Sequence, residues 1–158
     1  VPVRPDLYGE SGALGGIASA LVHARHDACL VVSCDMPFLN VELLRWMAGQ
    51  PRTYDVLVPR TRGESRQGGA SVYQTLHAIY AKRCLPVIER ALTAHRLQIV
   101  GFYGDVSVVA IDEAELRRFD PTLRSLVSVN SPEALALARR WYQSAPDAEG
   151  SESPEASL

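Results

Sequence analysis

The sequence has no run of 18 apolar residues, which is about the length that a helix needs to cross a bilayer. We therefore expect no transmembrane helix and no membrane partner. Basic side chains are not in excess either, because 16 Lys and Arg stand against 18 Asp and Glu. Proteins that bind the nucleic-acid backbone usually carry a basic surface, so the composition argues against nucleic acid as a partner.

Cysteine is also scarce. The three cysteines, Cys29, Cys34 and Cys84, form no Cys-x-x-Cys pair and are odd in number. Two of them are five residues apart on one predicted strand and therefore point to opposite faces. This pattern favours small buried side chains in a reducing compartment over a disulfide or a zinc site, and we expect a cytoplasmic protein.

The 158 residues, 47% of them hydrophobic, can bury one sizeable core. Short apolar runs alternate with segments of helical periodicity, which predicts an α/β fold with a mainly parallel sheet. We expect a domain over residues 1–143 and a disordered acidic tail over 144–158. The predicted strands are 29–34, 55–59, 74–80, 106–111 and 126–129; the predicted helices are 14–24, 41–49, one from about 85, one capped by Asp112 with Glu115 in a capping box, and one capped by Ser131.

The most informative stretch is the apolar run from Cys29, which ends in Asp35-Met36-Pro37. The run is too short for an ordinary helix and predicts a strand buried on both faces. Pro37 pushes Met36 toward extended geometry, so the chain cannot continue directly into a helix. We expect Asp35 at the carboxyl edge of the sheet, where open α/β folds bind their ligands. An aspartate at a strand end can also simply cap a turn.

A glycine-rich segment, Gly12-Ala13-Leu14-Gly15-Gly16, opens the first predicted helix. Glycines there let a ligand approach the unpaired amides of the first turn, which attract anions together with the helix dipole. They can equally serve close packing of helix and strand. His23 and His26 are spaced as a metal pair but have no third ligand nearby, and the apolar surroundings of His77 favour a structural role.

Several segments occur together in a recognisable order. They are Gly12–Ile17, Val32–Leu39, Gln74–Tyr80 followed by Cys84–Ile88, Phe119-Asp120-Pro121, and Val129-Asn130-Ser131-Pro132-Glu133. In this combination the sequence resembles the molybdenum cofactor guanylyltransferases and their nucleotidyltransferase relatives, over about residues 3–140. The resemblance implies a three-layer, Rossmann-like nucleotidyltransferase fold.

The resemblance also implies an activity: transfer of a guanylyl group from GTP to the terminal phosphate of molybdopterin, or of the molybdenum cofactor, with release of pyrophosphate. It implies that Asp35 is catalytic and holds Mg²⁺, and that the substrate-binding residues are Asp6, Gly12, Leu14, Gly15 and Asn130. Mg²⁺ suits such a site, because one or two carboxylates plus substrate phosphates usually hold it. Proteins that insert molybdenum or receive the finished cofactor are the implied protein partners.

The sequence departs from the family pattern in three places. Ala13 stands where the family usually has proline, and Ser128 stands where it has a first asparagine. Family members also begin with a strand and a glycine-rich loop that grips the triphosphate, and the sequence has no counterpart of either. Because the chain starts at Val1 without methionine, we expect a fragment that lacks this first strand and phosphate loop, binds GTP poorly and turns over little by itself.

Two other functions stay open. A related enzyme of the same fold could use CTP or activate a sugar phosphate, since base choice depends largely on the front loop and on residues 6–16. A degenerate, non-catalytic nucleotide- or pterin-binding module could act through a partner. The polar loop at 60–71, with Arg60, Arg62 and Arg66, is either a contact for the cofactor phosphate or a solvated surface loop.

Overall fold

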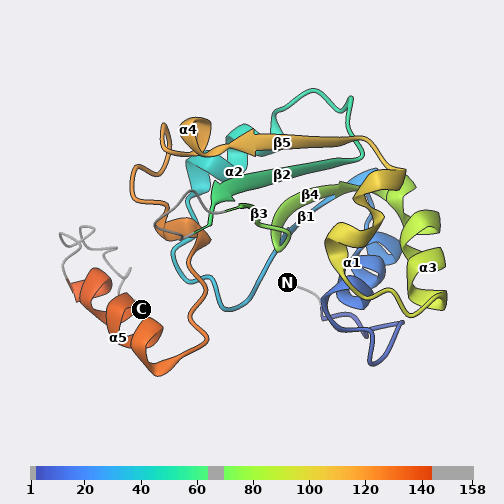
Figure 1. Ribbon diagram of the computed structural model, residues 1–158, viewed down its shortest axis with the longest axis horizontal. Helices are drawn as coiled ribbons and strands as arrows, with labels where there is room; N and C mark the ends of the chain where they lie inside the picture. The colour runs from blue at the N-terminus through green and yellow to red at the C-terminus, as the bar shows by residue number, and fades with distance from the viewer. Residues whose placement is uncertain (1–2, 64–69, 144–158) are drawn as a thin grey trace, which may run out of the picture. The chain divides into compact units, whose positions relative to one another are not determined.

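The structure is a computed structural model that describes residues 3–63 and 70–143. One mixed sheet of five strands lies at its centre, in the order β1-β4-β2, with β5 on the other side of β2 and β3 beside the end of β2 (Figure 1). The strands are β1 (Ala28–Val32), β2 (Val56–Arg62), β3 (Ser71–Tyr73), β4 (His77–Ala81) and β5 (Val108–Asp112).

The α/β class is confirmed, but the sheet is less parallel than the sequence pattern predicted. β1, β2 and β5 run in the same direction, while β4 lies between β1 and β2 and pairs antiparallel with both. The reason is the short connection after β2: the chain turns back through β3 into β4, and strands joined in this way pair antiparallel. The loop predicted at 60–71 is therefore partly strand, since β2 extends to Arg62 and β3 begins at Ser71.

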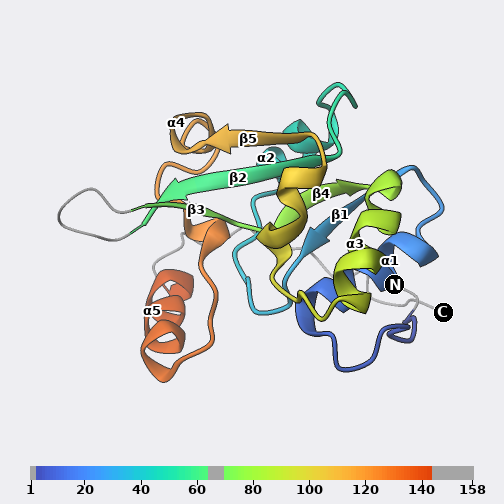
Figure 2. The ribbon, with the colours of Figure 1, turned by 45° about the vertical axis from the view of Figure 1, so that its right-hand side comes forward.

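Helices cover both faces of the sheet, which gives three layers. On one face α1 (Gly12–His23) and α3 (Leu85–Thr93) pack with Phe102 of the 3-10 helix Ile99–Asp105 on Val56, Val58, Ala78 and Tyr80. On the other face α2 (Val41–Ala48) and α4 (Glu113–Leu116) pack on Leu57, Ile79 and Ile111. Figure 2 shows α1 and α3 together beside the sheet.

Helix starts follow the sequence closely where a local hydrogen bond fixes them. The Asn40 side chain accepts a hydrogen bond from the Leu43 amide (2.9 Å), as expected for the cap of α2. Pro86 lies in the first turn of α3, also as expected. The predicted capping box of α4 is wrong, because no side chain caps that helix and the Asp112 carboxylate instead binds the Arg60 guanidinium at 2.6 Å.

Two strand predictions need correction. The segment predicted as a strand at 126–129 is not one: Leu126 ends the 3-10 turn Arg124–Leu126, in which the Asp120 carboxylate accepts a hydrogen bond from the Ser125 amide (2.7 Å), and residues 127–129 are irregular. β1 is not buried on both faces, since Leu30 and Val32 are 38% and 37% exposed. In the described part of the chain β1 pairs with β4 alone, and the core around α2 does not extend to Leu30 or Val32.

The chain forms two compact units that divide between Val127 and Ser128. The second unit contains α5 (Pro132–Gln143), where the Ser131 hydroxyl accepts a hydrogen bond from the Ala134 amide (3.2 Å) as the expected cap. The tail predicted over 144–158 lies outside the described residues, and the domain boundary at 143 stays a prediction. No helix in the described ranges is both long and apolar enough to cross a membrane.

Candidate functional site

Three parallel strands end at the same edge of the sheet. β1 leads into the turn that carries Asp35, β2 ends at Arg62, and β5 ends at Asp112. Open α/β sheets bind ligands outside the carboxyl ends of their strands, because loops there present side chains and free backbone groups. This edge is therefore the candidate site.

Asp35 stands in a turn that the sheet holds in place. The Ser33 amide donates to the carbonyl of Leu76, the residue just before β4 (2.9 Å), and the Met36 amide donates to the Ser33 carbonyl (3.4 Å). The Asp35 carboxylate is half-buried, and its Oδ1 is buried without a hydrogen-bond partner among the described residues. Buried polar atoms are nearly always paired, so this oxygen is suited to a ligand that brings a positive charge or a donor.

The first turn of α1 lies at the same end of the sheet as Asp35. Only residues 24–27 join α1 to β1, so helix and strand run in opposite directions, as Figure 2 shows. The 12 residues of α1 span about 18 Å, and the five residues of β1 about 16 Å, which brings the start of the helix near the end of the strand. The Ser11 hydroxyl donates to the Tyr8 carbonyl (2.7 Å) and leaves the first-turn amides without a side-chain cap.

The glycines and the leucine predicted to bind substrate differ in role. Gly12 is exposed with φ +57°, a conformation that favours glycine, and its surroundings are open. Gly15 is buried, and a Cβ there would come within 2.8 Å of the Ser11 Cβ, so close packing requires this glycine. The Leu14 side chain lies in the core with no exposure, so any nucleotide contact of this residue would go through its backbone.

Asp6 lies against the flank of α1 rather than at its first turn. Its Oδ1 accepts hydrogen bonds from the Ser19 hydroxyl (2.7 Å) and the Tyr8 amide (3.0 Å), and these bonds, that of Tyr8 first, lower the pKa of the Asp6 carboxyl. The residue is otherwise exposed and borders a hollow of about 490 Å³ with Gly16 and His23. No hydrogen bond joins Asp6 to Asp35 in the described part of the chain.

A second hollow, of about 550 Å³, opens at the carboxyl end of β2. Thr61, Arg62 and Gln74 border it, and the side-chain amide of Gln74 donates to the Thr61 hydroxyl (3.0 Å). Arg62 belonged to the basic loop in the sequence prediction; Arg66 lies outside the described residues. The sequence analysis did not predict that Thr61 and Gln74 are neighbours. They meet because the chain returns antiparallel after β2, and the sequence pattern did not predict that return.

His77 and Asp120 are buried close to this edge. His77 pairs in register with Val32 at the end of β1, has no exposed surface, and its two ring nitrogens lack partners among the described residues. Burial lowers the pKa of His77 to about 4, and the negative charge of Asp120 opposes this shift. Burial would raise the pKa of Asp120, but hydrogen bonds led by that of the Ser125 amide outweigh burial and lower it.

Asn130 belongs to the second unit and is exposed just before α5. Its expected position beside Asp35 stays a prediction. Within residues 3–63 and 70–143 no three His, Cys, Asp or Glu side chains converge in a way that could hold a metal ion. A metal at Asp35 would therefore need ligands from substrate and water, a coordination that Mg²⁺ accepts.

Comparison with known proteins assigns this chain to a family. Residues 1–106 match the family model described as the MobA-like NTP transferase domain. The chain belongs to this family. Because residues 1–106 include β1 and α1, the MobA-like match covers Asp6, Gly12, Gly15 and Asp35.

Individual relatives agree with the MobA-like family. The chain is 41% identical over 137 residues to a probable molybdenum cofactor guanylyltransferase of Pelotomaculum thermopropionicum, covering 87% of this chain and 63% of that protein. It is 36% identical over 134 residues to a molybdenum cofactor guanylyltransferase of Desulfosudis oleivorans, covering 84% and 62%. The chain thus spans somewhat less than two thirds of these relatives.

A solved structure supports the fold. The crystal structure of molybdopterin-guanine dinucleotide biosynthesis protein A from Archaeoglobus fulgidus matches with a TM-score of 0.74 and 28% identity, over 87% of this chain and 66% of that one. The three-layer nucleotidyltransferase fold expected from the sequence is confirmed in the part that the chain covers.

Proposed function

We propose that this chain is part of an enzyme that transfers a guanylyl group from GTP to the terminal phosphate of molybdopterin or the molybdenum cofactor, releasing pyrophosphate. The relatives named above support the reaction. The observation that carries the proposal is the buried Oδ1 of Asp35 at the carboxyl edge of the sheet, which has no hydrogen-bond partner among residues 3–63 and 70–143.

We propose that Asp35 holds Mg²⁺. A bound Mg²⁺ would offset the negative charge of the triphosphate and of the departing pyrophosphate. Asp35 suits this role because its turn is held by one hydrogen bond to Leu76, just before β4, and by one within the turn, so the carboxylate is pre-positioned. The uncapped first-turn amides of α1 would hold phosphate oxygens, since those amides and the helix dipole favour anions.

Asp6 favours GTP over CTP in this proposal. Its lowered pKa keeps the carboxylate ionised, and an ionised carboxylate only accepts hydrogen bonds. The base-pairing edge of guanine offers two neighbouring N–H donors, whereas that of cytosine offers one donor group beside two acceptors. Both hydrogen bonds that Asp6 accepts within the described residues go to Oδ1, so the other carboxylate oxygen, Oδ2, would be the acceptor for the base.

The acceptor phosphate would lie in the hollow at the end of β2, with Arg62 as its cation. Arg62 is exposed at the strand end, and its backbone amide donates to the Glu113 carboxylate (3.0 Å), which fixes the backbone from which the guanidinium extends. Attack of this phosphate on the α-phosphate of GTP needs no covalent enzyme intermediate, so positioning and electrostatics would account for the rate.

The test is Asp35→Asn in the full-length protein that contains this chain. Transfer of labelled GMP from α-³²P-GTP to molybdopterin should fall by at least about a hundredfold, the scale expected when a key electrostatic group is lost. Asp27→Asn is the matched control, because Asp27 is exposed at the opposite end of the same strand. Near-normal transfer by Asp35→Asn would refute the metal assignment, and equal competition by CTP would refute the base assignment.

A further inference from the structure

β5 is an open edge of the sheet on the side opposite β1. In the described part of the chain it pairs with β2 alone, and Figures 1 and 2 both show it as the outermost strand. Soluble proteins usually protect such an edge with lysine, proline, a bulge or a covering segment. The strand Val108–Asp112 contains no lysine or proline, and Val109 is 42% exposed. An unprotected apolar edge of this kind is a ready template for another strand.

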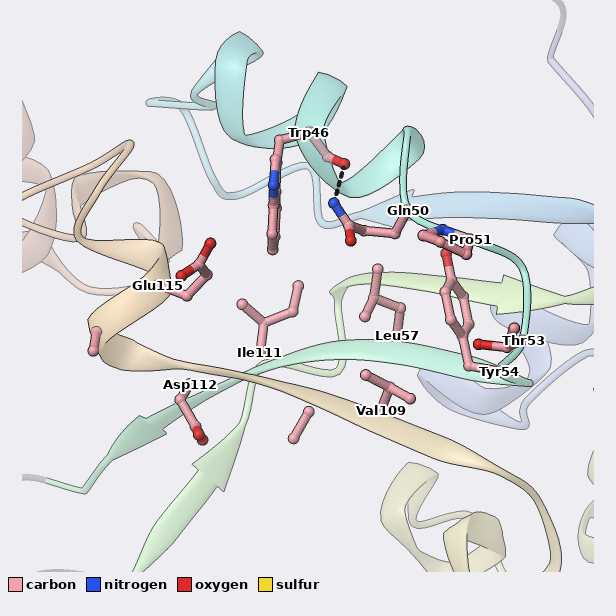
Figure 3. A pocket seen from close by; sticks show the side chains of 12 residues that line it. Trp46, Gln50, Pro51, Thr53, Tyr54, Leu57, Val109, Ile111, Asp112 and Glu115 are labelled. Atoms are coloured by element: carbon pink, nitrogen blue, oxygen red, sulfur yellow. Dashed lines mark hydrogen bonds between the residues drawn. The ribbon is translucent and has the colours of Figure 1, made fainter.

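A pocket of about 470 Å³ lies beside this edge (Figure 3). Leu57, Val109 and Ile111 form its floor, because Leu57 pairs with Val109 in register and Ile111 follows two residues later on the same face. Trp46 and Tyr54 stand as walls around this floor. Trp and Tyr in such positions are the side chains that most often dominate binding energy in protein interfaces.

The walls of the pocket are already fixed in position. The Trp46 ring packs on Phe119 with centroids 5.2 Å apart. The Gln50 side-chain amide donates to the Trp46 carbonyl (3.1 Å), and the Tyr54 hydroxyl takes a hydrogen bond from Arg52 (3.3 Å). A ligand would therefore lose little free energy to ordering these side chains on binding.

The charge of the residues that line the pocket limits which ligands it can bind. Asp112 and Glu115 border the pocket, and no Lys, Arg or His is among its lining residues. Phosphates are therefore unsuited to it. The partners of these two carboxylates, Arg60 and Arg118, are surface side chains whose ion pairs are worth little and can exchange. The favoured ligand combines an apolar group with a positive charge.

We infer that β5 is a docking edge for an extended segment of a partner protein. The segment adds as a strand to β5, seats one apolar side chain between Trp46 and Tyr54, and brings a basic side chain to Glu115, which lies on the pocket side of β5 while Asp112 points to the other face (Figure 3). A second copy of the chain is a poorer occupant, because residues 106–115 contain three carboxylates, including that of Glu113, and no basic residue. This surface runs along β5, the outer strand on the side opposite β1, and none of the residues that line its pocket has a role in the proposed reaction.

The probe is the peptide acetyl-Arg-Thr-Leu-Thr-Val-Thr-amide, whose alternate residues place Arg, Leu and Val on one face of a strand. It is titrated into the ¹⁵N-labelled chain to about 2 mM, where a complex with a Kd near 1 mM is about two-thirds formed. We expect saturable shifts of the β5 amides and the Trp46 indole. Val109→Lys should abolish them, whereas Val72→Lys, at an exposed valine of β3, should not.

Two further comparisons separate strand addition from non-specific contact. Two N-methylated peptides are compared, one methylated at the backbone nitrogens of the three threonines and one at those of the leucine and valine. Only one of the two should lose binding, because only one edge of the peptide pairs with β5. A peptide with Glu in place of Arg should bind about fivefold more weakly, and Glu115→Lys should reverse this preference.

Three results would overturn the inference. One is the absence of saturable shifts at β5, and another is an equal effect of both methylated sets. The third is a dimer of the chain in sedimentation velocity that Val109→Lys converts to monomer, because the occupant would then be a second copy.

Discussion

The stability of this fold should depend on pH through a single buried imidazole. His77 has no exposed surface and its pKa is lowered from 6.5 to about 4, first by burial, with Asp120 acting in the opposite direction. In the unfolded chain His77 takes up a proton below about pH 6.5. The folded protein does not take up that proton until the pH approaches 4. Protons therefore favour the unfolded state over this interval.

The magnitude follows from the two pKa values. A difference of about 2.5 corresponds to about 3 kcal/mol, because each pKa unit is worth about 1.4 kcal/mol. The contribution of His77 is fully present above pH 6.5 and falls as the pH drops toward 4. By pH 5 about 2 kcal/mol should be lost, which is a large fraction of the 5–15 kcal/mol that typically stabilises a domain.

The assay is urea unfolding of the chain and of His77→Gln at a series of pH values from 7.5 to 4.5. The free energy of unfolding of the original chain should fall more steeply than that of His77→Gln, so the two curves should converge by about 2 kcal/mol at pH 5. His26→Gln, at an exposed histidine, is the matched control and should run parallel to the original chain. Parallel curves for His77→Gln would show that this imidazole is not held neutral.

Two matched pairs of substitutions test local structure in the same unfolding assay. Gly15→Ala should lower the free energy of unfolding, because its Cβ would come within 2.8 Å of a neighbouring side chain. Gly16→Ala has open space and should stabilise the helix by up to about 1 kcal/mol. The opposite order of stability would be inconsistent with this packing. Asn40→Ala should cost about 1–3 kcal/mol, because the side chain caps α2 and also donates to the Phe119 carbonyl (2.9 Å). Asn40→Asp keeps the cap and loses only the donor, so it should cost less, and equal costs would show that the cap does not contribute.

Features fixed by neighbouring residues could be predicted from the sequence. The caps at Asn40 and Ser131 and the proline in the first turn of α3 depend on hydrogen bonds and steric limits within four residues. Asp35 at the end of a strand was predictable for the same reason, because an apolar run followed by Met-Pro leaves the chain few local choices.

Features that depend on distant residues could not be predicted in this way. The insertion of β4 between β1 and β2 is set by long-range pairing, and nothing in the apolar run of β4 encodes its direction. The run at 126–129 has β-forming residues, yet one hydrogen bond from the Ser125 amide to Asp120 turns the chain there. Asp112 looks like a helix cap in sequence, but Arg60, 52 residues away, takes its carboxylate.

The two predicted carboxylate ligands, Asp6 and Asp35, are in different physical states, and this decides what each can bind. Asp6 already accepts two hydrogen bonds on one oxygen, which lower its pKa and fix its orientation, so it is prepared to accept further N–H donors from a neutral base. Asp35 has a buried oxygen with no donor among the described residues, which leaves a desolvated acceptor to be satisfied. A cation satisfies such an oxygen better than a neutral donor does, because the interaction between opposite charges strengthens as water is excluded. When Mg²⁺ is titrated into the chain, the NMR signals of the backbone amides of residues 33–36 should therefore shift. Asp35→Asn should abolish this response, whereas Asp6→Asn should leave it unchanged. A metal response that survives Asp35→Asn would assign the cation to another group.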